Sequence, residues 1–392
     1  MANTLELGNG KWATGKDTVL AFNDENNNFK PLPFSFSRNS SATVVNKEGL
    51  IETVGSGEPR IDFKDNTKGA MLLEPSRTNL ITQSESFSNS YWAKARLTAT
   101  SNSVISPDGT LNASKIFGDG SNSWKYINRN GFSLINQNYY TFSVFAKADT
   151  LNYVQLILSG ATAENYQNFD LLNGVIGSGS NVFDAKIETF VNGWYKCSMT
   201  VLATSTATTD LFIDLADSST MSRAGSFLTS GGIYIYGAQL EQGSYATSYI
   251  PTSGSAVTRV AESCSNENLN VDYSGDYTLY LEHETLSITE YNQFQFRQET
   301  SISYIFRVGN SINVGSGLYS ATNTIGFNKF ALSVGSDGSY SFYKNGSLLS
   351  SGSGLNANLE TLKGDATGMS IKDIKLYNTR LSNSELQALT SN

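Results

Sequence analysis

The only histidine of the chain limits the catalytic chemistry that the sequence can support. His283 lies between two carboxylates in Tyr280-Leu281-Glu282-His283-Glu284, and this segment is typical of a β-strand. We therefore interpret His283 as a strand residue rather than a general base. No Gly-x-Ser-x-Gly elbow, phosphate-binding loop or His-Glu-x-x-His motif occurs in the 392 residues. We predict that the protein is not an enzyme. Glycosidases need only two carboxylates, which sequence spacing does not locate, so a glycan-degrading activity is left open.

Metal chemistry is limited in the same way. One histidine and two distant cysteines exclude multi-histidine zinc sites, zinc fingers and iron–sulfur frameworks. Calcium takes oxygen ligands and is left open as a structural ion. No loop has the ligand spacing of a calcium site, so we expect no cofactor and interpret the candidate carboxylates as surface groups. These are Asp170, Asp214, Asp217, Asp272 and Asp276.

The charge of the chain excludes two further classes of function. With 27 Lys+Arg against 35 Asp+Glu the net charge is −8, and the basic residues form no cluster suited to nucleic acid. No apolar run approaches the roughly 18 residues that a membrane-spanning helix requires. Met1–Gly8 lacks the basic and apolar regions of a secretory signal peptide, so we expect synthesis in the cytoplasm without such a signal.

The two cysteines predict no disulfide framework. Cys197 lies in the alternating segment Trp194–Val201, on the same face as Tyr195 and Met199, which predicts a buried core thiol. Cys264 lies in a polar stretch, where we expect an exposed thiol.

Strands must position these groups, because alternating apolar and polar residues recur along the chain between Gly, Asn and Asp turn signals. Short strands at this spacing predict an all-β fold of two antiparallel β-sandwiches, jelly-roll or concanavalin-like. Asp337-Gly338 and Asn345-Gly346 predict type I′ hairpin turns. The capping box Ser382–Glu385 predicts one short C-terminal helix. The clearest strand candidates are Tyr140–Ala146, Tyr153–Leu158, Val182–Phe190, Trp194–Leu202, Leu211–Leu215, Ile233–Leu240, Tyr277–His283, Phe294–Arg297, Ser303–Val308, Lys329–Val334, Tyr340–Tyr343 and Ile371–Tyr377.

Composition divides the chain into three parts. Residues 1–80 are broken by prolines into short extended pieces, and we expect them to form a separate segment for attachment or oligomerisation. The polar stretch Pro251–Asn270 has no periodicity and marks a domain boundary. We therefore expect one sandwich over residues 81–256 and a second over residues 257–392.

Several strands are expected to present flat and polar side chains on one outer face, opposite their core residues. Aromatic rings that stack on pyranose rings, together with amides and charged groups that bind hydroxyls, would form a glycan-binding surface. The same face would equally suit packing against another subunit, and the pattern does not separate these two alternatives. In the glycan interpretation, alanine at Trp194 or Tyr153 weakens binding without loss of stability. The candidate residues are Tyr153, Gln155, Trp194, Lys196, Tyr234 and Tyr236.

Several motifs occur together between residues 34 and 254: Phe36–Asn46 with Gly49-Leu50-Ile51, Pro59–Phe63, Leu72–Leu80, Tyr140–Lys147, Gly193–Lys196, Tyr236–Gly243 and Ala246–Thr252. This part of the chain, roughly residues 34 to 254, resembles a module of bacteriophage tail and fibre proteins. That module is similar to the CenC-like carbohydrate-binding jelly rolls.

The C-terminal part resembles a concanavalin-like, laminin-G-type sandwich. Ser341–Gly346, Ile371–Asn378 and Leu381–Leu386 carry this second resemblance. Together the two resemblances imply a virion protein, such as a tail fibre, head fibre or receptor-binding protein. They imply a homotrimer that is attached to other virion proteins through its N-terminal segment and binds host surface polysaccharide. Two alternatives stay open: a decoration or adaptor protein that binds no glycan, and a capsule-degrading enzyme.

Overall fold

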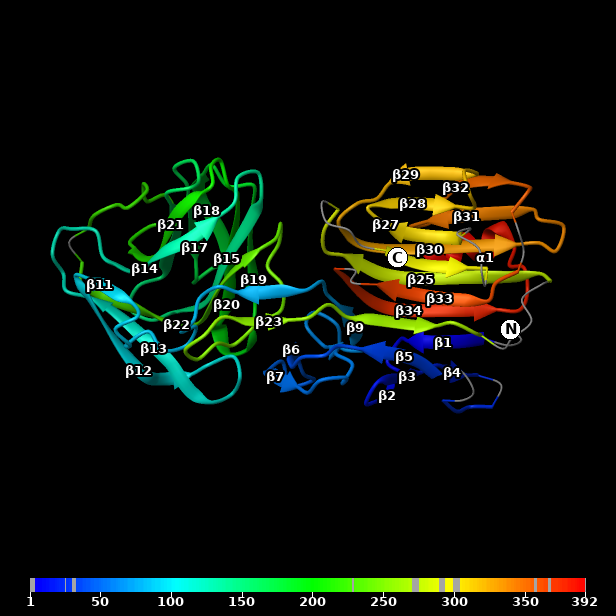
Figure 1. Cartoon of the computed structure of the whole chain (residues 1–392), viewed down its shortest axis with the longest axis horizontal. Helices are drawn as coiled ribbons and strands as arrows, with labels where there is room; N and C mark the ends of the chain where they lie inside the picture. The colour runs from blue at the N-terminus through cyan, green and yellow to red at the C-terminus, as the bar shows by residue number, and fades with distance from the viewer. Residues whose placement is uncertain are drawn as a thin grey trace. The chain divides into compact units, whose positions relative to one another are not determined.

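The computed structural model describes residues 4–24, 26–29, 33–227, 229–269, 275–288, 293–298, 304–355, 358–365 and 368–391. This part of the chain is all-β, with antiparallel sheets and one short α-helix, as expected (Figure 1). It divides into two compact units. Unit 1 comprises Met1–Lys47, Thr53–Ser76 and Val260–Asn392, and unit 2 comprises Glu48–Glu52 and Arg77–Arg259.

Unit 2 contains two six-stranded sheets within the described residues. Sheet I has the order β11-β14-β21-β16-β17-β18, and sheet II has the order β12-β13-β22-β15-β20-β19. The strands of sheet I are β11 (Ala93–Ala95), β14 (Tyr126–Leu134), β16 (Tyr153–Ser159), β17 (Tyr166–Asp170), β18 (Val175–Ser180) and β21 (Ala207–Ala216). Those of sheet II are β12 (Leu97–Ile105), β13 (Leu111–Gly118), β15 (Tyr139–Ala148), β19 (Asp184–Thr189), β20 (Tyr195–Leu202) and β22 (Gly231–Gln242), and a 3-10 turn (Val191–Gly193) precedes β20.

Eight of these strands have the connectivity of a jelly roll. The orders β14-β21-β16-β17 and β13-β22-β15-β20 place successive strands alternately in the two sheets, apart from the β16–β17 hairpin. Val154, Leu156 and Leu158 of β16 are buried in the core between the sheets, as the period-two pattern predicts. The two ends of unit 2 meet, because β10 (Arg77–Asn79) pairs with β23 (Val257–Arg259).

Unit 1 contains two nine-stranded sheets within the described residues. Sheet III has the order β32-β31-β30-β25-β34-β1-β4, with β9 and β8 joined to β34, and sheet IV has the order β2-β3-β5-β24-β33-β26-β27-β28-β29. The strands of sheet III are β1 (Thr4–Gly8), β4 (Phe22–Asn23), β8 (Ile61–Asp62), β9 (Ala70–Leu73), β25 (Tyr277–Thr285), β30 (Gly326–Val334), β31 (Tyr340–Lys344), β32 (Ser347–Gly352) and β34 (Met369–Tyr377). Those of sheet IV are β2 (Ala13–Gly15), β3 (Thr18–Leu20), β5 (Pro33–Ser37), β24 (Ser263–Asn266), β26 (Gln293–Arg297), β27 (Tyr304–Gly309), β28 (Ser311–Val314), β29 (Tyr319–Thr322) and β33 (Thr361–Asp365). Two short strands, β6 (Ala42–Val45) and β7 (Ile51–Val54), lie outside these sheets.

The N-terminal residues are part of the C-terminal sandwich, which differs from the separate segment expected over residues 1–80. Strand β1 pairs with β34 along its whole length, and β5 pairs with β24. Figure 1 shows β1 in blue next to β34 in red. Leu5 and Leu7 are buried in the same core as Ile374 and Leu376. Prolines divide residues 1–80 into short strands, but apolar residues of these strands lie in the same core as those of residues 260–392.

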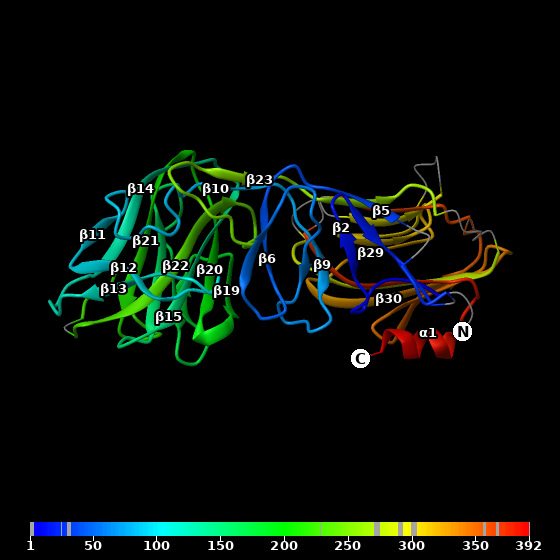
Figure 2. The same ribbon diagram turned by 90° about the horizontal axis from the view of Figure 1, so that it is seen from below.

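Local sequence signals predicted correctly the start of the C-terminal helix and one of the two hairpin turns. Helix α1 (Asn383–Thr390) begins after Ser382, which forms the expected capping box with Glu385, and it packs on the side of β30 away from sheet IV (Figure 2). Asn345 and Gly346 both have positive φ, as a type I′ turn requires. Asp337 does not, so the preceding hairpin turns differently, with Gly338 alone in the left-handed region.

Both cysteines lie in the described part of the chain, and both thiols are buried. Cys197 lies in the core of unit 2, as predicted. Cys264 was expected to be exposed and is buried instead, because β24 is an interior strand whose Cys264 faces Phe36 in the register. Burial raises the pKa of Cys264 to about 12, so this thiol is unreactive at neutral pH.

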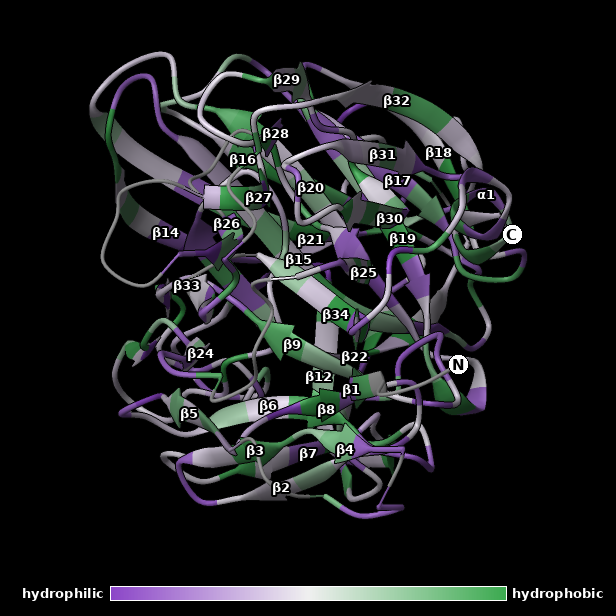
Figure 3. Ribbon diagram, turned by 90° about the vertical axis from the view of Figure 1, so that its right-hand side faces the viewer, coloured by the Kyte–Doolittle hydropathy of each residue, from purple (hydrophilic) through white to green (hydrophobic). Residues whose placement is uncertain are grey.

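Hydrophobic residues are interspersed with polar ones along the strands of both units (Figure 3). Among the described residues there is no helix of the length and apolarity needed to cross a membrane.

Candidate functional site

Four of the six predicted glycan-binding residues are buried, which corrects the expectation of an outer face. Trp194 is 0% exposed, and its indole Nε1 donates to the Ile105 carbonyl at 3.0 Å. The Tyr236 hydroxyl lies 2.9 Å from Asp108 Oδ2, and burial raises its pKa above the ordinary range. Lys196 donates from Nζ to the Thr247 carbonyl at 2.5 Å. These contacts leave no surface on these side chains for a sugar.

The fourth buried residue, Gln155, joins a polar network beneath the surface of sheet I. Its Nε2 donates to Asn168 Oδ1 at 2.8 Å, and its Oε1 accepts from the Ala224 amide at 2.8 Å. The remaining two candidates, Tyr153 and Tyr234, are half-buried. They belong to different sheets, because Tyr153 is in β16 and Tyr234 in β22. The six residues therefore do not form one face.

Period-two alternation predicted correctly that these side chains point away from the core, but not that further chain covers them. Trp194 and Tyr236 pack with Tyr249, which comes from the segment after β22. Nothing in the sequence of β20 or β22 shows that a later segment returns over the sheet. This is a tertiary contact, and alternation describes only one strand at a time.

Three aromatic rings form a partly exposed cluster on the outer side of sheet I. Trp124, which precedes β14, lies 4.1 Å from the Tyr126 ring and 5.1 Å from the Phe212 ring, measured between centroids. All three side chains are half-buried rather than enclosed. Tyr126 and Phe212 lie on the adjacent strands β14 and β21, with Tyr126 opposite Asp214 in the register. We call Trp124, Tyr126 and Phe212 the aromatic cluster.

A buried carboxyl adjoins the aromatic cluster. The indole Nε1 of Trp124 donates to Asp214 Oδ2 at 2.7 Å, which fixes the plane of the indole. Burial raises the pKa of Asp214 well above its usual range, and the neighbouring Arg223 opposes this only in part. Asp214 Oδ1 is buried and has no hydrogen-bond partner among the described residues. The cluster thus offers partly exposed aromatic surface whose central indole is held in place by a buried carboxyl.

The sequence contained a signal for this cluster that alternation alone does not use. Trp124 and Tyr126 are two residues apart, and Phe212 and Asp214 have the same spacing, so each pair lies on one face of its strand. What the sequence did not show is that β14 and β21 are neighbours, because more than 70 residues and several strands separate them.

The predicted metal ligands are dispersed. Asp214 is buried next to Trp124, and Asp170 accepts hydrogen bonds from the Leu172 and Asn173 amides in a turn. Asp217 is exposed, Asp276 accepts from the Ser336 amide, and Asp272 lies outside the described residues. No group of three or more potential His, Cys, Asp or Glu ligands was found among the described residues.

His283 lies in β25, as predicted, and is fully buried. Its Nε2 is 2.9 Å from Thr285 Oγ1, and its ring stacks on Phe330. Burial lowers the pKa of His283 to about 3, so the imidazole is neutral at physiological pH.

A carboxylate cluster of unit 1 lies on the face of sheet III opposite its core. Asp373 is opposite Glu282 in the register of β34 and β25. Lys375 Nζ contacts both Asp373 Oδ2, at 2.9 Å, and Glu6 Oε1, at 3.0 Å. Burial raises the pKa of Asp373 to about 7 despite the favourable charge of Lys375, and Glu6 and Glu282 act in the same direction as burial. A carboxyl of this kind holds a proton near neutral pH.

Replacing Asp373 with asparagine should remove part of the pH dependence of stability. Because the folded-state pKa of about 7 is above the ordinary value of 3.8, the folded state binds this proton more tightly than the unfolded chain. The free energy of unfolding should therefore fall as the pH rises from about 4 to about 7, by up to about 1.4 kcal/mol per pH unit. Denaturant unfolding at pH 5 and pH 8 measures this fall, which Asp373→Asn should reduce and the exposed-site variant Glu267→Gln should not. An equal fall in both variants would contradict the assignment.

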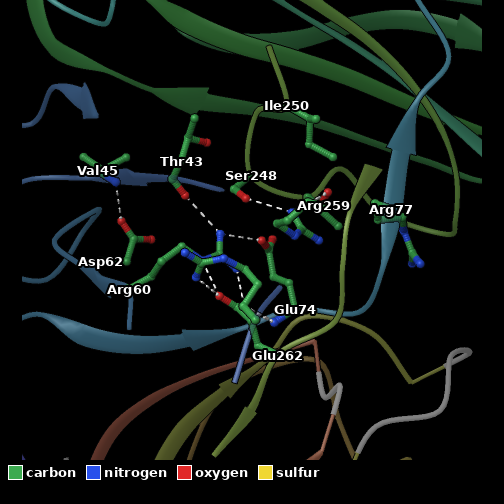
Figure 4. Close-up of polar contacts among 12 residues, drawn as sticks. Thr43, Val45, Arg60, Asp62, Glu74, Arg77, Ser248, Ile250, Arg259 and Glu262 are labelled. Atoms are coloured by element: carbon green, nitrogen blue, oxygen red, sulfur yellow. Dashed lines mark hydrogen bonds and ion pairs between the residues drawn. The ribbon is translucent and has the colours of Figure 1, made fainter. Parts of the chain in front are cut away.

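A cluster of four buried charged residues is paired internally in unit 1. Glu262 accepts from Arg38 Nη1 and from Arg60 Nε, both at 2.8 Å, and its second oxygen contacts Arg60 Nη2. Arg60 also pairs with Glu74 at 2.8 Å, and Glu262 Oε2 accepts from the Glu74 amide at 2.9 Å (Figure 4). All four side chains are buried. We call Arg38, Arg60, Glu74 and Glu262 the charge cluster; three of them come from the motifs that carry the bacteriophage resemblance.

No protein-family model matches the chain, and no curated protein matches it. Among solved structures, a Trypanosoma rangeli sialidase matches with 11% identity and a TM-score of 0.25, over 95% of this chain and 65% of that one. A mutant of that sialidase with trans-sialidase activity matches with 10% identity and a TM-score of 0.25, over 96% of this chain and 82% of that one. The chain thus spans slightly less than two thirds of the first neighbour. Scores this low carry no argument about fold or activity.

Proposed function

We propose that the protein is a bacteriophage virion component of the fibre or receptor-binding type, a binder rather than an enzyme, and that unit 2 binds host surface glycan. The observation that carries this proposal is the aromatic cluster, in which three partly exposed rings adjoin a buried carboxyl. Rings that are held by neighbours and by a hydrogen bond offer a preorganised stacking surface, which lowers the entropic cost of binding.

The motifs support the virion part of the proposal. Arg38, Arg60 and Glu74 are buried in one charge cluster although they lie in three separate motifs. Residues from three motifs of the resemblance are therefore linked by ion pairs, as expected of motifs that encode one structure. In a multimeric virion protein, several weak glycan sites would raise the effective concentration of each site and supply attachment through avidity. A homotrimer remains our expectation for the assembly.

Replacing Trp124 and Tyr126 with alanine should weaken binding to host polysaccharide strongly while the protein stays folded. We expect the double variant to lose at least tenfold in affinity on a host-polysaccharide array and to stop protecting host cells from phage adsorption, because aromatic anchors dominate such interfaces. Phe183→Ala, which removes a ring that is 51% exposed in the same unit, is the matched control and should bind normally. If the wild-type protein binds no host glycan as a correctly assembled oligomer, the proposal fails.

The second candidate is a decoration or adaptor protein whose sandwiches contact other virion proteins. The burial of Trp194, Lys196 and Tyr236 favours it only by removing three of the six predicted glycan contacts from the surface. Localising the chain by electron microscopy in intact particles, together with the array experiment, separates the two functions. Release of reducing sugar from host polysaccharide would instead indicate a depolymerase.

A further inference from the structure

A groove lies at one end of sheet II, distinct from the aromatic cluster on sheet I. It has a volume of about 390 Å³ and lies where β12 begins, β13 ends and β22 begins. Volumes of about 300–1,000 Å³ are typical of small-molecule sites. The lining residues are Arg96, Leu97, Thr98, Phe117, Gly118, Asp119 and Ser230.

Phe117 gives this groove an aromatic wall. Its side chain is 37% exposed. Lys115 Nζ lies 5.2 Å from the centre of the Phe117 ring and is itself held by Asp149 at 2.7 Å. The ring is therefore constrained by a neighbouring side chain and still accessible.

Polar groups around Phe117 are available for a ligand. Arg96 uses only Nε, which donates to the Trp124 carbonyl at 2.6 Å, and no partner for its two Nη atoms occurs among the described residues. Asp119 accepts from Ser121 through Oδ1, and its Oδ2 is likewise uncommitted in the described part of the chain. Thr98 and Ser230 add exposed hydroxyl groups. A cationic donor, an anionic acceptor and hydroxyls next to a ring are complementary to a neutral sugar.

The backbone at Arg96 has a strained conformation. Arg96 has a φ of 56°, in the left-handed region that glycine or asparagine normally occupies. A non-glycine residue there costs stability, and such outliers cluster at ligand-binding sites. The strain places the guanidinium at the turn between β11 and β12, where it faces the groove.

We propose that this groove is a second glycan subsite that binds one neutral hexose, stacked on Phe117, with vicinal hydroxyls between Arg96 and Asp119. This inference takes its class of ligand, a glycan, from the proposed function, but it rests on different residues. The two sites share no side chain, and Arg96 meets the aromatic cluster only through the Trp124 carbonyl, which Trp124→Ala keeps. Unit 2 would then be bivalent, and the second site would strengthen attachment through effective concentration.

Saturation-transfer NMR on the full-length Trp124→Ala/Tyr126→Ala variant tests the groove separately from the aromatic cluster. The probes are the methyl glycosides of glucose, galactose and mannose. We expect at least one to bind this variant, and adding Phe117→Ala to lower the signal at least fivefold, whereas adding Phe183→Ala leaves it unchanged. Failure of all three probes, or binding that is insensitive to Phe117→Ala, overturns the subsite. Loss of the array signal in the Trp124→Ala/Tyr126→Ala variant concerns only the proposed function.

A second variant separates binding from folding. Arg96→Gly removes the guanidinium and relieves the positive φ, so it should weaken hexoside binding at least fivefold without lowering the melting temperature. Unchanged binding in Arg96→Gly would exclude the guanidinium from the site. A lower melting temperature would show that Arg96 serves folding instead.

Discussion

Replacing Glu262 with glutamine should lower the free energy of unfolding of unit 1 by about 3–5 kcal/mol. Glu262 contacts both Arg38 and Arg60, and all these side chains are at most 1% exposed. With Glu74, the charge cluster contains two positive and two negative groups. Removal of one carboxylate leaves an unbalanced guanidinium charge in a region of low dielectric constant, and that charge is costly to bury.

Thermal unfolding of the full chain measures this effect. For a unit of this size the loss corresponds to a fall in melting temperature of about 10 °C. The matched control is Glu267→Gln, the same change at an exposed position of unit 1, which should stay within about 0.5 kcal/mol of wild type. A Glu262→Gln protein as stable as the control would show that the charge cluster contributes nothing net.

Replacing Trp194 with alanine should destabilise unit 2 by about 3–5 kcal/mol. Trp194 is fully buried with Phe145, Tyr236 and Tyr249, and truncation to alanine leaves a cavity there. It also leaves the Ile105 carbonyl without the indole donor. This outcome is the reverse of the sequence-based expectation, in which Trp194→Ala weakens glycan binding at constant stability.

Denaturant unfolding, paired with glycan binding at a temperature where the variant is folded, distinguishes the two expectations. We expect Trp194→Ala to unfold at lower denaturant concentration and to bind glycan as wild type does. Trp194→Phe keeps most of the apolar volume and should lose less stability. Weakened binding with unchanged stability in Trp194→Ala would restore the interpretation of Trp194 as a ligand-contacting residue.

Alternation and turn chemistry predicted the fold class because they are local. The all-β fold, the strands around Val154 and Cys197, the Asn345-Gly346 turn and the Ser382 cap all follow from residues close in sequence. The place of the N-terminal strands in the fold depends instead on contacts between residues far apart in sequence. Pairing of β1 with β34 joins residues more than 360 positions apart, and no local pattern specifies that register.

The site was less predictable than the fold for the same reason. Which side of β20 or β22 faces away from the core follows from period two, but whether that side is open depends on segments that return over it. Tyr249 covers Trp194, and Met221 and Ala224 lie over Gln155. The aromatic cluster required knowing that β14 and β21 are neighbours.

The main segment of unit 2, Arg77–Arg259, begins and ends at one place, and this makes the segment an insert between two parts of unit 1. Strands β10 and β23 pair at its two ends, while in unit 1 Glu74 and Glu262 exchange hydrogen bonds on either side of the insertion point. The scaffold therefore closes on itself without the insert, as domains tolerant of insertion do. Residues 77–259 could therefore be replaced by another sandwich while the Glu74–Glu262 contacts of unit 1 are kept.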